Sequence, residues 1–217
     1  MYFNADGTYG VTRGPNISGV INISIPEYHN NIPVTQILDN AFNGYKKIER
    51  ILIPQTIKII GVGAIPTSSD SSLKEIIVYK DTIQQNYEIF YSSSDGALLR
   101  HDMGSVYLEI FPRCKTGEYV IPDNVDVLRD KVFYYSQIDR LVVGTNVSLI
   151  SRRAFNKCEK LTSLEFKNGG TTALSFHPEA FYLTTNLTSL TIFLMSGQAI
   201  ILLGLAAAAC NMAGNYV

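Results

Sequence analysis

The sequence predicts an α/β-type solenoid, built mainly from short parallel β-strands that are joined by tight helical or 3₁₀ turns. Two repeated phrases predict this fold. The first contains three apolar residues at spacings of three and two, and it occurs seven times with a single polar exception, Thr116. The copies are Val20-Ile23-Ile25, Ile48-Ile51-Ile53, Leu73-Ile76-Val78, Thr116-Tyr119-Ile121, Ile138-Leu141-Val143, Leu161-Leu164-Phe166 and Leu187-Leu190-Ile192.

Each copy of this phrase predicts one short strand. Its last two members are separated by one residue, so in a strand both side chains point to the same face. The middle residues follow one another at intervals of 22 to 28 residues, with one longer interval of 43. A period in the twenties is typical of a solenoid, in which no coil buries its own apolar edge and neighbouring coils must stack.

The second phrase is Ala or Val followed by a bulky apolar residue, and it predicts the turn half of each coil. The copies are Ala41-Phe42, Ala64-Ile65, Val132-Phe133, Ala154-Phe155 and Ala180-Phe181. Between strand and phrase lie apolar pairs three residues apart, such as Val125 with Leu128 and Val147 with Ile150. This spacing is typical of a tight helical or 3₁₀ turn.

Two stretches, Ile48 to Ala64 and Val147 to Phe166, resemble the BspA-type leucine-rich repeat of bacterial surface proteins. The first stretch contains the pattern Ile-x-x-Ile-x-Ile-Pro. The second contains the pattern Ala-Phe-x-x-Cys-x-x-Leu-x-x-Leu-x-Phe. The resemblance implies a right-handed leucine-rich repeat solenoid with an inserted β-hairpin. It also implies a cell-surface or secreted protein that binds other macromolecules and has no enzymatic activity.

The repeats suggest four segments along the chain. Residues 1–19 are expected to form an N-terminal capping hairpin around Asp6-Gly7, followed by repeats 1–3 in residues 20–82. Residues 83–112 are expected to form the inserted hairpin, because Asp95-Gly96 is a strong two-residue turn signal. Repeats 4–7 occupy residues 113–217, with Ile201 and Leu203 expected inward, and the array is expected to continue beyond this segment.

Composition and charge are those of a globular body and point to no charged partner. With 217 residues, 46% of them hydrophobic and 17% charged, the chain can bury a sizeable core, and its net charge of −1 does not favour nucleic acid or anionic lipid as a partner. The apolar segment 199–210 is shorter than the roughly 20 residues of a membrane helix, so no membrane insertion is expected. Three cysteines and three histidines, all widely separated, predict no metal site, no cofactor and no catalytic residues.

The residues between the apolar positions predict a partner-binding surface on the outward strand face. In parallel stacked strands each position of the phrase forms a continuous row. One row contains the consecutive apolar residues Leu52, Ile77, Val120 and Val142, and the row beside it contains Arg50, Glu75, Glu118 and Arg140. We expect Arg50 to pair with Glu75 and Arg140 with Glu118, which leaves an apolar stripe beside charge, the pattern of a contact surface.

Three explanations of this stripe remain open. An extracellular or host protein binds there, the inserted hairpin covers it, or β-branched residues are simply tolerated in strands. The first explanation gives the leading hypothesis, a non-enzymatic surface or secreted repeat protein that mediates protein–protein interaction or adhesion. The alternatives are a spacer that carries another domain and a polysaccharide-binding module, whose candidates Tyr134, Tyr135 and Tyr182 lie near the turns rather than on the strand face.

Overall fold

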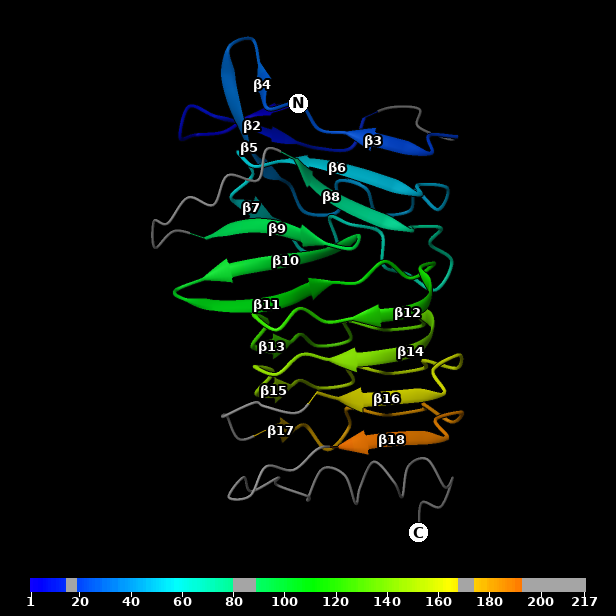
Figure 1. The fold of residues 1–217 in the computed structure, drawn as a ribbon. Helices are drawn as coiled ribbons and strands as arrows, with labels where there is room; N and C mark the ends of the chain where they lie inside the picture. Colours follow the sequence, from blue (N-terminus) through cyan, green and yellow to red (C-terminus); the bar gives the residue numbers. More distant parts are fainter. Residues whose placement is uncertain (15–18, 80–88, 168–173, 193–217) are drawn as a thin grey trace. The chain divides into compact units, whose positions relative to one another are not determined.

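The computed structural model describes residues 1–14, 19–79, 89–167 and 174–192. The chain divides into two compact units, Met1–Gly104 and Ser105–Val217. In each unit, short strands follow one another in stacked coils (Figure 1). The predicted inward positions Ile201 and Leu203 lie outside the described residues.

The first sheet of unit 1 contains the predicted N-terminal hairpin. Its strands are β1 (Tyr2–Phe3), β2 (Tyr9–Val11), β4 (Tyr28–His29), β5 (Ile32–Ile37) and β7 (Ile59–Ile60). β1 and β2 pair in antiparallel fashion across a turn in which Gly7 has a φ of 82°. The Asp6 carboxylate accepts the backbone N–H of Thr8 at 3.0 Å, which closes this turn. An antiparallel strand pair thus forms around Asp6 and Gly7.

The second sheet of unit 1 contains the first three copies of the apolar phrase. It consists of the parallel strands β3 (Asn22–Ser24), β6 (Arg50–Pro54) and β8 (Glu75–Tyr79). Ile23 is paired with Ile51, and Ile51 with Ile76, so the middle residues of the phrase stand in one row. Ile51, Ile53 and Ile76 are fully buried, which confirms the predicted inward face.

A β-hairpin follows in unit 1 and lies along the edge of β8. Its strands β9 (Phe90–Ser94) and β10 (Ala97–Asp102) flank Asp95 and Gly96, whose φ values of 45° and 79° suit the tight hairpin turn that the sequence predicts. The Ile76 N–H donates to the Gly96 carbonyl at 2.8 Å, and the Val78 N–H donates to Ser93 Oγ at 3.0 Å. The hairpin thus satisfies backbone donors at the β8 edge.

Unit 2 has two parallel sheets. One contains β12 (Thr116–Val120), β14 (Gln137–Val143), β16 (Ser163–Phe166) and β18 (Ser189–Ile192), which carry the last four copies of the phrase. The other contains β11 (Ser105–Ile110) and the two-residue strands β13 (Val127–Leu128), β15 (Leu149–Ile150) and β17 (Ser175–Phe176). The two sets form separate columns of arrows in Figure 1.

The predicted helical or 3₁₀ turns are not present. The residues that the structure describes contain no helix of either type. The apolar pairs three residues apart end instead in the short parallel strands, because Leu128 lies in β13 and Ile150 lies in β15, and these two residues are paired in register. The architecture is therefore a β-solenoid of stacked coils, without the helical component of the predicted α/β-type fold.

The hydrogen bonds of the turns explain why no helix forms. The N–H groups of Val132 and Tyr134 bond back within their own turn, but the Phe133 N–H donates to the Ala154 carbonyl of the next coil at 2.9 Å. Alternate donors therefore leave the turn, and a helical ladder cannot continue. Lys131 and Tyr135 also have positive φ values of 58° and 56°, which a right-handed helix does not allow.

The core of unit 2 is organised around a row of phenylalanines from successive turns. Phe133, Phe155 and Phe181 are all at most 1% exposed. The ring centroids of Phe133 and Phe155 are 5.5 Å apart with an interplanar angle of 15°, and those of Phe155 and Phe181 are 4.8 Å apart at 23°. These offset stacks hold successive coils in one register.

Candidate functional site

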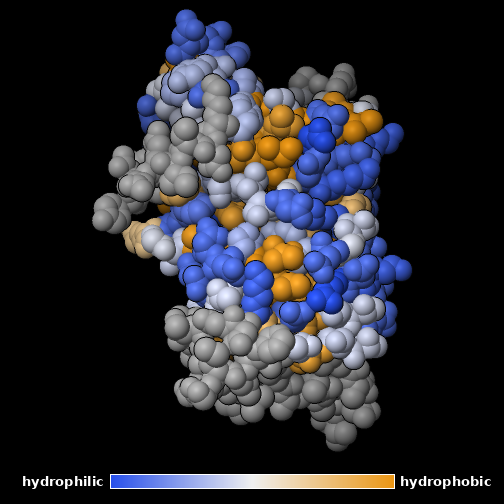
Figure 2. Space-filling model, viewed as in Figure 1, coloured by the Kyte–Doolittle hydropathy of each residue, from blue (hydrophilic) through white to orange (hydrophobic). Residues whose placement is uncertain are grey.

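The outward face of β3, β6 and β8 in unit 1 has the predicted arrangement of rows. Leu52 is paired with Ile77 and Arg50 with Glu75. Leu52 and Ile77 are both half-buried, because their β-carbons point away from the core while neighbouring side chains cover part of them. Figure 2 shows hydrophobic side chains next to hydrophilic ones in this part of unit 1.

The charged row beside them is ion-paired. The Arg50 guanidinium contacts the Glu75 carboxylate, as the sequence predicts. A second pair at the start of the same strands joins Lys74 Nζ to Glu49 Oε2 at 2.9 Å. Exposed ion pairs of this kind contribute about 0 to 1 kcal/mol to stability. Their effect here is to fix the orientation of charges beside the apolar side chains.

Beside the described residues of the hairpin, this face stays partly exposed. The hairpin bonds to the backbone edge of β8, as described above, and Ile77 keeps an intermediate exposure. Inside the hairpin, the Phe90 ring stacks on the His101 imidazole at 4.2 Å, and Leu98 is fully buried. Leu52 and Ile77 keep partial exposure beside the described residues of the hairpin, and all three explanations of the stripe stay open.

The outward face of unit 2 carries the other half of the stripe, but its two members differ. Val120 on β12 is 40% exposed, whereas Val142 on β14 is only 7% exposed. The expectation that Val142 offers a free apolar surface is therefore wrong. Val142 stands between Val120 of β12 and Glu165 of β16 in register, so it has neighbours on both sides. Within unit 2, β12 pairs only with β14 in this sheet, which leaves Val120 more open.

Arg140 joins three strands of the unit 2 face. Its Nε lies 2.7 Å from Glu118 Oε2, the predicted pair, and its second guanidinium nitrogen donates to Glu165 Oε2 at 2.6 Å. Glu165 is paired with Val142 and so continues the row of apolar residues. Its contact with Arg140 therefore runs diagonally, from this row to the neighbouring charged row. Two carboxylates share one guanidinium, so this part of the face has a negative excess.

Unit 1 also contains a cavity that sequence reasoning missed. Its volume is about 450 Å³, and its lining includes Tyr28, Thr35, Lys58 and Phe90, which come from separate segments. One wall is fixed by the hydroxyls of Thr8 and Thr35, 2.7 Å apart. Because the lining also includes one carboxylate, that of Glu27, the cavity does not favour ions of one sign.

Cys158 occupies the motif position between Phe155 and Leu161 and is fully buried. Burial raises the pKa of its thiol to about 12. Its Sγ donates to the Phe133 carbonyl at 2.9 Å, so the thiol has a structural partner and stays protonated at neutral pH. In the described part of the chain, no group of three potential metal ligands occurs, and no helix is long and apolar enough to cross a membrane.

Solved structures of leucine-rich repeat proteins share this fold. The pneumococcal vaccine antigen PcpA matches with a TM-score of 0.57 and 19% identity, over 81% of this chain and 48% of the antigen. The leucine-rich repeat protein TpLRR of T. pallidum matches with a TM-score of 0.50 and 18% identity, over 86% of each chain. The present chain thus spans about half the length of the pneumococcal antigen. Identities this low show similarity of fold alone.

Sequence comparison gives the family. Curated proteins provide no match. The family model of the BspA type leucine-rich repeat region, by contrast, matches in six copies over residues 17–96 and 99–198, which is most of the chain. The matched ranges include the strands β3 to β9 and β11 to β18. The chain belongs to the BspA-type leucine-rich repeat family.

Proposed function

We propose that this chain is a cell-surface repeat protein that binds partner proteins through the outward faces of its strands and performs no catalysis. The observation that carries the proposal is the same in both units: an apolar side chain on the outward face stands beside ion-paired charges. In unit 1 these are Leu52 and Ile77 beside the Arg50–Glu75 pair, and in unit 2 it is Val120 beside Arg140. Apolar surface rimmed by charge is typical of a protein contact.

The location at the surface rests on the family and on analogy. The sequence resembles the repeat of bacterial surface proteins, and the pneumococcal protein that shares this fold is a vaccine antigen. Shared fold alone does not establish a shared role, so the location is part of the proposal.

The geometry suits a flat partner surface. Parallel strands about 4.8 Å apart hold the outward side chains in fixed rows. Burying a half-exposed leucine or isoleucine contributes about 1 kcal/mol, half of the full value for such a side chain. The flanking ion pairs are already formed before binding, so their side chains lose little conformational freedom when the partner arrives.

Matched aspartate substitutions test the proposal. Leu52→Asp and Val120→Asp place a charge on the outward faces. Ile59→Asp and Leu149→Asp change the charge equally at exposed apolar positions in the other sheets, where Ile59 is 52% and Leu149 is 39% exposed. Each variant is immobilised and exposed to a mixture of extracellular proteins, and captured proteins are quantified by mass spectrometry. Circular dichroism checks that each variant is folded.

The two face variants are expected to lose at least about tenfold of the specifically captured protein, which corresponds to about 1.4 kcal/mol. The two control variants are expected to keep it. Equal capture by Leu52→Asp, Val120→Asp and the unsubstituted chain refutes the proposal. Val142 is unsuitable as a probe, because a charge at a position that is 7% exposed would destabilise the fold itself.

A further inference from the structure

The turns of unit 2 form a second surface with different chemistry. We call it the turn face and define it by Lys131, Tyr135, Arg152, Arg153, Lys157 and Tyr182. These residues come from three successive turns, which backbone hydrogen bonds hold together, among them Lys131 N–H to the Arg152 carbonyl and Lys157 N–H to the Tyr182 carbonyl, both 3.2 Å. The turn face contains four cations, whereas the whole chain has a net charge of −1.

One part of the turn face is centred on the ring of Tyr135. Lys157 Nζ donates to the Tyr135 hydroxyl at 2.7 Å and lies 4.9 Å from the centre of its ring. The Arg113 guanidinium lies 5.6 Å from the same ring centre. The Tyr135 hydroxyl raises the pKa of Lys157, so this amine stays charged. Two cations therefore converge on one tyrosine, and Lys157 donates to a neutral oxygen rather than to a carboxylate.

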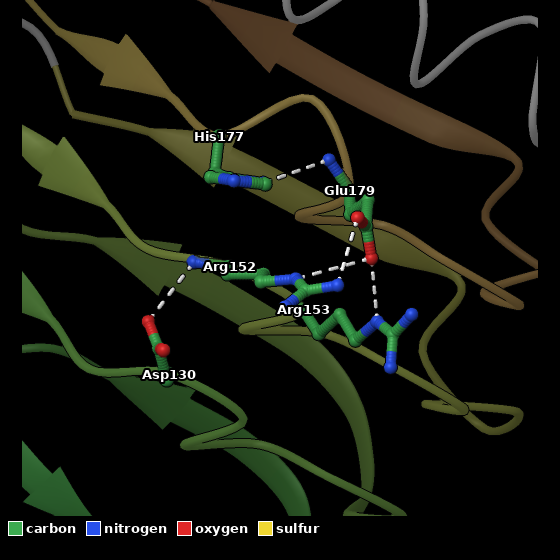
Figure 3. Close-up of polar contacts among 5 residues, drawn as sticks. All are labelled: Asp130, Arg152, Arg153, His177 and Glu179. Carbon is green, nitrogen blue, oxygen red and sulfur yellow. Dashed lines mark hydrogen bonds and ion pairs between the residues drawn. The ribbon is translucent and has the colours of Figure 1, made fainter.

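The other part is centred on Glu179, whose carboxylate contacts two guanidinium groups (Figure 3). Arg153 Nε donates to Glu179 Oε2 at 2.6 Å, and an Arg152 terminal nitrogen donates to Oε1 at 3.1 Å. These bonds lower the pKa of Glu179. The Arg153 guanidinium also lies 5.0 Å from the centre of the Tyr182 ring. Two cations share one carboxylate here, so a positive charge is left in excess.

The surrounding backbone fixes these groups in position. The Glu179 N–H donates to His177 Nδ1 at 3.1 Å, and the Arg152 N–H donates to Asp130 Oδ1 at 3.1 Å, as Figure 3 shows. Asp130, Glu179 and Glu159, whose charge also raises the pKa of Lys157, are the acidic groups near the turn face, against its four cations and Arg113 beside Tyr135. Because the turns are held on both sides, the excess positive charge is presented on a rigid surface.

We propose that the turn face binds an acidic segment of a partner protein. Ammonium and guanidinium groups offer only donors, so the complementary ligand supplies anionic oxygen acceptors, which in a protein segment are the carboxylates of Asp and Glu. Arginine and tyrosine are among the residue types that contribute most often to the binding energy of protein interfaces. The rings of Tyr135 and Tyr182 already have cations against them, which disfavours the stacking of sugar rings on the same tyrosines. The turn face and the strand face use different residues, so the two proposals fail independently.

Binding of a fluorescein-labelled oligoglutamate of about ten residues, measured by fluorescence anisotropy at low salt, tests the inference. An oligolysine of the same length and a sulfated oligosaccharide serve as comparison probes. The oligoglutamate is expected to bind, with affinity that falls as salt is added, and the oligolysine is not. Lys157→Glu and Arg153→Glu are each expected to weaken binding at least about tenfold, which is the effect of one lost and one inverted contact.

Lys160→Glu is the matched control, because Lys160 is exposed in the same unit and lies outside the turn face. It is expected to change the affinity less than about twofold. Lys157→Met removes the cation without adding a carboxylate and is expected to weaken binding in the same direction. The inference is overturned by the absence of oligoglutamate binding, by an equal loss in Lys160→Glu, or by binding of the sulfated oligosaccharide alone. Circular dichroism of every variant excludes unfolding as the cause.

Discussion

Replacing Phe155 with alanine tests whether stacked phenylalanines hold the coils of unit 2 together. Phe155 is fully buried between Phe133 and Phe181, with ring centroids 5.5 and 4.8 Å away. Removal of a buried phenylalanine side chain costs about 3 to 5 kcal/mol. Because Phe155 takes part in two stacked pairs, we expect a loss above the lower end of this range, about 4 kcal/mol. Phe155→Leu keeps most of the apolar volume but loses both stacks, so about 2 kcal/mol is expected.

Urea unfolding followed by circular dichroism measures these losses. The chain has no tryptophan and 13 tyrosines, so tyrosine fluorescence provides a second probe. Since two compact units need not unfold together, amide hydrogen exchange is the sharper measurement. Exchange should accelerate first at Phe133 and Phe155, whose N–H groups donate to the next coil at 2.9 Å. A loss below about 1.5 kcal/mol for Phe155→Ala, or an increase in exchange spread evenly over both units, would refute the reasoning.

Two further predictions concern single residues of the same turns. Lys131 has a φ of 58°, in the left-handed region. Lys131→Gly is therefore expected to raise the free energy of unfolding by about 0.5 to 1 kcal/mol, because the relief of left-handed strain exceeds the entropy cost of glycine. An unchanged or lower urea midpoint would contradict this. The raised pKa of the Cys158 thiol stabilises the fold fully below the unfolded value of 9.0, and this contribution is lost as pH rises toward about 12. Between these two pH values, the free energy of unfolding should fall by about 1.4 kcal/mol per pH unit more than that of Cys158→Ala. If the two free energies of unfolding change with pH in the same way, the thiol has no such role.

The strand half of each coil could be predicted from the sequence, since alternation within a strand and repetition between coils are both written in it. The registers of Arg50 with Glu75 and of Glu118 with Arg140 follow from the positions of the apolar phrase alone. The exposure of Val142 could not be predicted in the same way. It depends on which neighbouring strands flank it and on the diagonal reach of Glu165 toward Arg140.

The turn half was harder to predict for a physical reason. Apolar residues three apart suit a helical turn and also suit a bend that enters a short strand, so Val125 and Leu128 do not distinguish the two. The deciding feature is the left-handed backbone at Lys131 and Tyr135, and neither residue type signals it. The contact of Glu179 with Arg153 was detectable in principle, because these residues are 26 positions apart, about one repeat. A spacing of about one repeat places the two residues in neighbouring turns.

The two faces of unit 2 show why net charge is a poor guide to the partners of a repeat protein. On the strand face, Glu118 and Glu165 share one arginine, which leaves negative charge in excess. On the turn face, Arg152 and Arg153 share one carboxylate, which leaves positive charge in excess. Stacked coils place the same position of each repeat on the same face of the solenoid. Excess charges of opposite sign can therefore lie on different faces while the net charge of the chain stays near zero. A chain with a net charge of −1 can therefore present two surfaces of opposite sign, each suited to a different partner.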